Sequence, residues 1–223
     1  MTRPRLKLWA PSAVGAVVTA AVLVAGASLW ADRPAGAADH LDPPARTNIG
    51  TMSDTAADIA DLFLWNGTST VTVIVTEAGP KEAGQPPVYD RDVLTRIHLS
   101  NDGDPTTDEF VIDARYGRDG SGNWGVQFLN IPGATGPVVG PVQTALTDGT
   151  LVKAEAGLFD DPFFFDLQGF NDTKATGTLS ITSTRNFFAG KNDTSFVIEF
   201  PRAAVASSHP LTAWVETRRI TGS

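Results

Sequence analysis

The sequence predicts an all-β protein: a single-domain β-sandwich of short antiparallel strands joined by long loops rich in Gly, Pro and Asp. Short runs alternate apolar and polar residues, as half-buried strands do. Clusters of turn-forming residues separate these runs, and no helical period lasts for a dozen residues after residue 37. Many short strands with turns between them are typical of sandwiches and barrels.

Residues 1–37 have the pattern of an export signal. Arg3, Arg5 and Lys7 make a basic start, and an apolar run follows over residues 13–30. Small residues at Ala35 and Ala37 favour cleavage after Ala37. Cleavage one residue later and retention as a membrane anchor are the alternatives. We therefore expect a secreted or cell-envelope protein.

Composition narrows the classes of partner. The whole chain has 17 Lys and Arg against 25 Asp and Glu, a net charge of −8. Without residues 1–37 the counts become 13 and 24, because four cations and one anion are removed, and the net charge is −11. A protein this acidic is a poor partner for nucleic acid and for anionic membranes. With no cysteine, it has neither disulfides nor thiolate metal sites.

The elements follow in order along the chain. We expect an extended lead-in over residues 38–55 and one sandwich domain over residues 56–223. Asn66-Gly67 between two apolar runs predicts a β-hairpin. A short helix is expected within residues 201–207, and residues 132–148, rich in Gly and Pro, are expected to be irregular. The expected strands are residues 59–65, 70–76, 94–99, 109–114, 124–128, 151–155, 177–184, 195–200 and 212–217.

The turn at residues 101–109 is the first candidate cation site. Asp102, Asp104 and Asp108 supply carboxylates around Gly103, and Ca²⁺ prefers six to eight oxygen ligands at such flexible turns. The spacing does not fit the twelve-residue loop of helix-flanked calcium sites. The alternative is an ordinary turn, because Asp and Gly populate turns for backbone reasons alone.

Asp54, Asp58 and Asp61 form a second acidic group. Their spacing of four and then three residues would place all three on one face of a helical turn. Like charges so arranged suggest a counter-cation at Asp58 and Asp61. Asp54 is expected to be a helix N-cap.

The segment at residues 156–170 combines five Phe with three Asp. Burying unpaired carboxylates is costly, so Asp160 and Asp161 need a cation, an arginine or backbone donors. The prediction is a cation or polar ligand beside an aromatic wall. The alternative is an Asp-Asp-Pro turn over core aromatics, with Phe163 and Phe165 on one face and Phe164 on the other.

His40 gives a separate metal hypothesis. After cleavage at Ala37 it is the third residue, and the amine, two amides and the imidazole can then wrap Cu²⁺ or Ni²⁺ in a tetragonal nitrogen site. Cleavage after Ala38 would abolish this chelate.

Catalytic motifs are largely missing. The chain has no Gly-x-Ser-x-Gly, no His-Glu-x-x-His, no phosphate loop and no dinucleotide fingerprint. An enzyme is therefore the less favoured class. The alternative is an extracytoplasmic hydrolase, acting on carbohydrate, that uses two of the clustered aspartates as acid and base.

Five blocks in order resemble the family called domain of unknown function 4331. Its most specific block is Asp160-Asp161-Pro162-Phe163-Phe164. The resemblance implies an exported bacterial protein with one mainly β domain and no established activity. The five blocks are residues 38–44, 58–63, 101–104, 156–166 and 186–192.

The leading functional hypothesis is a binding or structural module with Ca²⁺-like sites in its Asp-rich loops. Its partner would be a small molecule, a glycan or an envelope protein. We expect no nucleic acid partner, and no membrane contact beyond the export signal.

Overall fold

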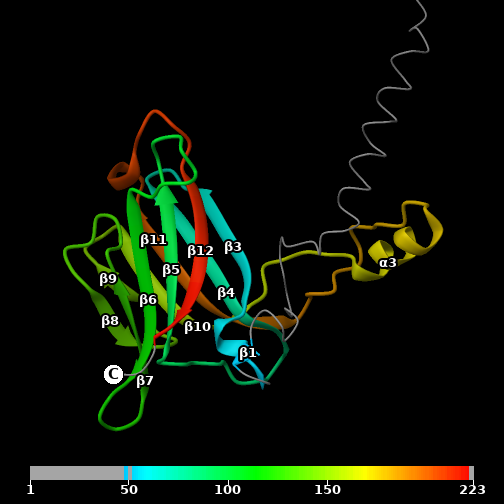
Figure 1. Ribbon diagram of the computed structural model, residues 1–223, viewed down its shortest axis with the longest axis horizontal. Helices are drawn as coiled ribbons and strands as arrows, with labels where there is room; N and C mark the ends of the chain where they lie inside the picture. The colour runs from blue at the N-terminus through cyan, green and yellow to red at the C-terminus, as the bar shows by residue number, and fades with distance from the viewer. Residues whose placement is uncertain (1–47, 50–51, 221–223) are drawn as a thin grey trace, which may run out of the picture. The chain divides into compact units, whose positions relative to one another are not determined.

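The computed structural model describes residues 48–49 and 52–220, which belong to one compact unit within residues 38–223. Two antiparallel five-stranded sheets pack face to face (Figure 1), which confirms the predicted β-sandwich. The first sheet has the order β3-β4-β11-β10-β9 and the second β12-β5-β6-β7-β8. The strands of the first sheet are β3 Ile59–Asn66, β4 Thr70–Glu82, β9 Leu146–Asp148, β10 Val152–Asp160 and β11 Lys191–Pro201. Those of the second are β5 Val93–Ser100, β6 Phe110–Arg118, β7 Trp124–Leu129, β8 Val138–Pro141 and β12 Thr212–Arg219.

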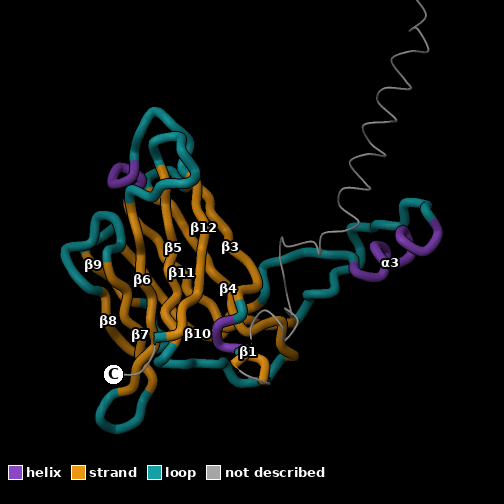
Figure 2. The backbone as a smooth tube through the Cα atoms, in the orientation of Figure 1, coloured by secondary structure: helices purple, strands orange, loops and turns teal. Residues whose placement is uncertain are grey.

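The remaining elements are short. β1 Asn48–Ile49 pairs with β2 Met52–Ser53, and two 3₁₀ turns, η1 Thr55–Ala57 and η2 Arg202–Val205, flank the sandwich. The helix α3 Leu167–Thr176 lies on a segment that projects from the strands (Figure 2).

The core lies between the two sheets and follows from the alternation of the strands. Val71, Val73 and Val75 of β4 are fully buried, and Phe196, Phe200 and their neighbours on β11 pack beside them. Each such side chain contributes about 1.5–3 kcal/mol by leaving water. With no disulfide available, this apolar layer holds the sheets together.

The Asn66-Gly67 prediction is confirmed. Asn66 ends β3, the Gly67 amide donates to the Thr70 carbonyl, and β4 returns antiparallel to β3. The short helix expected within residues 201–207 is η2.

Two element predictions are wrong. Residues 177–184 form no strand; they fold back against α3, because their polar groups bond to that helix and its cap rather than to a neighbouring strand. Residues 132–148 were expected to be irregular but contain β8 and β9. These short strands form because β8 pairs with the longer strand β7 and β9 pairs with the longer strand β10.

Candidate functional site: a groove across three strands

A groove of about 650 Å³ lies on the outer face of the second sheet, across β6, β7 and β8. Inward side chains of these strands alternate with outward ones, so every second residue faces solvent. Two outward rows cross the groove in register. One is Arg115–Gln127–Val139, and the other is Gly117–Gly125–Pro141.

The glycine row explains why this face is hollow. Gly117 and Gly125 are directly paired, so neither strand places a side chain there. A Cβ on Gly125 would lie 2.9 Å from the Gly140 carbonyl oxygen, whereas one on Gly117 would meet nothing within 4 Å. The space above Gly117 is therefore open.

An aromatic stack lies on the opposite, inner face of the same strands. The Arg118 guanidinium lies 4.2 Å from the centre of the Trp124 ring, which suits a cation–π contact. Trp124 contacts Tyr89, and Tyr89 contacts Tyr116 at a centroid distance of 4.6 Å. Tyr116 in turn stacks on Phe196 of the core, so Arg118 and Trp124 continue the inner face of β6 and β7 behind the floor of the groove.

The carboxylate at the groove, Asp119, is committed to its own turn. It accepts hydrogen bonds from the amides of Ser121 and Asn123 and from the Asn123 side chain. These bonds, led by the Asn123 side chain, lower the pKa of Asp119. Its negative charge is therefore satisfied by the turn.

A second polar group lies on the same sheet, across β12 and β5. The His98 ring stacks on Trp214 with centroids 4.8 Å apart. Its Nδ1 contacts Asp108, and its Nε2 lies 3.2 Å from Glu216. Burial raises the pKa of Glu216, but hydrogen bonds from Arg218 and His98 outweigh it and the pKa is lowered. The predicted calcium ligand Asp108 thus contacts a histidine.

The other two aspartates of the acidic turn are capping groups. Asp102 accepts from the Asp104 amide, and Asp104 accepts from the amide and hydroxyl of Thr106. Both carboxyl groups have a lowered pKa, caused first by these hydrogen bonds. Asp102 and Asp104 therefore stabilise a hydrogen-bonded turn, which was the alternative to a cation site.

The three aspartates near the start of the domain do not share one helical face. Asp54 precedes η1 without capping it, and its carboxylate binds Arg219 through Nε at 2.7 Å. Asp58 follows η1, and Asp61 lies on β3, where its amide donates to the Thr76 hydroxyl. The predicted helical arrangement and the N-cap role of Asp54 are both wrong, because η1 has only three residues and a β-bulge follows it.

A buried carboxyl group at Glu77 was not predicted. Glu77 lies on the inner face of β4, in line with Val73 and Val75. Burial raises its pKa to about 8, the Thr95 hydroxyl bond lowers it, and nearby Asp58 raises it. A break in the apolar run after Val75 is the only sign of this group in the sequence.

The Phe-rich segment forms an arm, residues 161–190, between β10 and β11. Asp161 begins it and accepts a hydrogen bond from the Phe163 amide, while Asp160 ends β10. Phe163 and Phe165 stack on each other, as the alternation predicts, and Phe164 is 51% exposed. Five of the eight large exposed apolar side chains in the described part of the chain belong to this arm: Phe164, Phe170, Leu179, Ile181 and Phe187.

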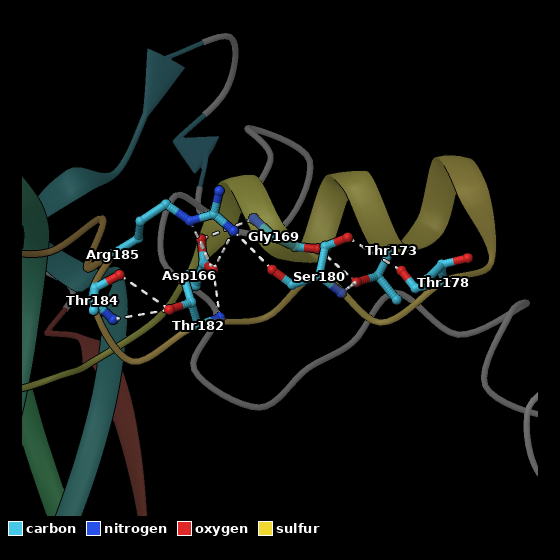
Figure 3. A network of polar contacts seen from close by, with 8 residues as sticks. All are labelled: Asp166, Gly169, Thr173, Thr178, Ser180, Thr182, Thr184 and Arg185. Carbon is cyan, nitrogen blue, oxygen red and sulfur yellow. Dashed lines mark hydrogen bonds and ion pairs between the residues drawn. The ribbon is translucent and has the colours of Figure 1, made fainter.

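Asp166 organises the arm (Figure 3). It caps α3 by accepting from the Gly169 amide at 2.8 Å, and it also accepts from the Thr182 amide and from two nitrogens of Arg185. The Arg185 guanidinium also donates a hydrogen bond to the Ser180 carbonyl oxygen. Burial raises the pKa of Asp166, but these donors outweigh it and the pKa is lowered.

Metal ligation stays a prediction. Among residues 48–49 and 52–220 no three His, Asp or Glu side chains are grouped so that they could hold a metal ion. His40 and the export signal lie outside the described residues. In the described part of the chain no helix combines the length and apolarity needed to cross a membrane.

Comparison with family models, with curated proteins and with solved structures gives no match for this chain. The resemblance to the domain of unknown function 4331 family therefore stays a prediction, and function has to be argued from the site.

The groove was not predicted from the sequence. Its signal is Gly117 and Gly125 at corresponding positions on either side of the turn at residues 119–123. Only the register of the hairpin shows that these glycines pair.

Proposed function

We propose that this protein is an extracytoplasmic binding module, not an enzyme, whose ligand lies in the groove across β6, β7 and β8. The observation that carries the proposal is the hollow above the Gly117–Gly125 pair. Its volume of about 650 Å³ lies within the usual range of ligand sites, about 300–1,000 Å³. The signal pattern of residues 1–37 supports export.

The composition of the groove favours binding over catalysis. Its carboxylate, Asp119, is held by its own turn with a lowered pKa, whereas a general acid needs a raised one. Arg115 and Gln127 offer charge and hydrogen bonds, which are means of holding a ligand.

A groove-filling variant tests the proposal. Gly117→Leu places a side chain in open space and requires no unusual backbone angle, so it should fold normally. The control is Gly136→Leu, whose Cβ also meets nothing within 4 Å and which does not line the groove. Both variants and the unmodified chain are titrated with dextran and with polygalacturonate.

The proposal requires that at least one polysaccharide binds the unmodified chain and Gly136→Leu but not Gly117→Leu. Binding that is equal in all three proteins, or absent from all three, would overturn it. Thermal melts of each variant show whether a lost affinity reflects a lost fold.

A divalent-cation role is the second candidate, and Asp161 favours it. Its Oδ2 is buried without a hydrogen-bond partner among the described residues. Carboxylate oxygens in that state suit Ca²⁺, which would complete its shell with main-chain carbonyls and water. We expect millimolar Ca²⁺ to raise the melting temperature of the metal-stripped chain, and Asp161→Asn to abolish the rise. Equal melts with and without Ca²⁺ would refute this role.

A further inference from the structure

Arginines of this acidic chain are mostly paired, and one exception faces the groove. Among the described arginines, only three make no ion pair with a described residue: Arg115, Arg118 and Arg202. Of these, Arg115 belongs to an outward row of the groove, whereas Arg118 lies on the inner face of β6 against Trp124. On the same sheet, by contrast, Arg96 binds Asp113 through two hydrogen bonds of 2.7 and 2.8 Å.

An unpaired arginine beside a groove has a specific chemistry. Its planar guanidinium presents parallel N–H groups that match the two oxygens of a carboxylate. The nearest acid in sequence, Asp113, is bound by Arg96 instead of by Arg115. The groove therefore presents one unpaired cation to a ligand on a chain whose net charge is −8.

The position of the groove restricts the kind of ligand. The groove lies on the face of the sheet, and the main-chain groups of β6 and β7 are used in pairing with their neighbours. A peptide cannot add a strand there, as it would at an edge. The ligand must be recognised by side chains and by the shape of the floor.

That floor suits a sugar ring. The row Gly117–Gly125–Pro141 carries no side chain other than the Pro141 ring, which leaves room for the C–H face of a pyranose. Beside it, Gln127 is exposed, and its amide makes no side-chain hydrogen bond with a described residue. An amide offers both donors and an acceptor, as hydroxyl groups require.

Resting on the proposed function, we propose that the ligand is an acidic polysaccharide whose uronate carboxylates pair with Arg115. The sugar rings lie along the glycine row, and Gln127 hydrogen-bonds their hydroxyl groups. Carboxylates, not negative charge in general, are the recognised groups, because the fork of arginine matches two coplanar oxygens.

The test compares polymers that share a backbone. Polygalacturonate, its fully methyl-esterified form and dextran sulfate are titrated against the exported chain at two salt concentrations. Arg115 is exposed and makes no ion pair with a described residue, so Arg115→Gln should fold. Arg115→Lys keeps the charge but loses the fork, and Arg202→Gln is the control for loss of one unpaired cation.

We expect polygalacturonate to bind best, and Arg115→Gln to lower its affinity about tenfold or more, the usual effect of one charge-assisted hydrogen bond. Arg115→Lys should also weaken binding, and Arg202→Gln should not. Higher salt should weaken binding of the unmodified chain.

Failure of this inference differs from failure of the proposed function. If the methyl ester or dextran sulfate binds as tightly as polygalacturonate, and Gly117→Leu abolishes that binding, the groove stands and carboxylate recognition is overturned. If no polymer binds the unmodified chain, both are overturned. If Arg115→Gln and Arg202→Gln lose the same affinity for polygalacturonate, the loss reflects net charge alone, and the inference is overturned.

Discussion

The Thr95 hydroxyl on β5 donates a 2.5 Å hydrogen bond to the Glu77 carboxyl group on β4, so one polar contact crosses the core between the two sheets. Glu77 lies at the end of a buried valine row, and Tyr116 is near enough that Glu77 raises the pKa of its hydroxyl, an effect second to that of burial. This placement makes the stability of the sandwich depend on pH.

Stability should fall as the pH rises above neutral. Burial raises the pKa of Glu77 from 4.5 to about 8, so the folded state holds a proton that the unfolded chain releases at lower pH. This contribution is complete below the unfolded pKa and is lost as the pH rises through the folded one. We expect the free energy of unfolding, from urea melts, to drop by roughly 3 kcal/mol between pH 6 and pH 9.

Glu77→Gln should remove most of that drop, because the amide keeps an acceptor for Thr95 and does not titrate. Glu155, on β10, makes no ion pair with a described residue, so Glu155→Gln serves as the matched control. A wild-type slope that persists in Glu77→Gln would show that another group titrates.

Arg219 joins both ends of the described domain. It binds the nearly buried Asp54 before η1 and also Asp90, at 2.6 Å. Arg219→Met would leave Asp54 buried without its cation, so we expect a loss of about 3 kcal/mol in urea unfolding. Arg218→Met removes a more exposed cation from the adjacent position and should cost less than about 1 kcal/mol. Similar losses in the two variants would contradict this assignment.

The arm should loosen without unfolding the sandwich when Arg185 is replaced. Arg185→Met leaves the Asp166 carboxylate with only its amide donors and removes the hydrogen bond to the Ser180 carbonyl, although the amides of Ser180 and Thr182 still donate to α3 and its cap. We expect faster hydrogen exchange and faster proteolysis within residues 161–190, while exchange in β4 and β11 stays unchanged. Arg91→Met, which removes an exposed ion pair with Asp92, should change neither.

Gly169→Ala tests the packing of the arm independently of charge. A Cβ there would lie 2.3 Å from Asp166 Oδ2 and 2.6 Å from the Ser180 carbonyl oxygen. We therefore expect the same local loosening as in Arg185→Met, although alanine normally favours helix over glycine. Gly120→Ala, in open space, should exchange hydrogen like the wild type. Unchanged protection of the Thr182 amide in Gly169→Ala would contradict the close packing.

The sequence predicts the sandwich well because strand alternation and turn residues are local signals. Asn66-Gly67 specifies its hairpin, and the valine row of β4 specifies a buried face. Residues 177–184 alternate in the same way, yet they pack on α3, because alternation does not identify the partner.

The candidate site is harder to predict because it depends on pairing. Nothing near Arg115 in the sequence shows that it lacks an acid while Arg96 has one. Asp102 and Asp104 were recognised as acidic, but the donors that satisfy them come from the turn geometry. Register and hydrogen-bond partners, not residue types, distinguish a site from a capped loop.

The arm interrupts a hairpin whose two strands are already paired: Asp160 lies opposite Asn192, so the chain leaves and re-enters the sheet at one place. A segment joined in this way can lengthen, shorten or be replaced without altering the order of the strands. Changes in the length or sequence of residues 161–190 should therefore leave the pairing of β10 with β11, and the core behind it, intact.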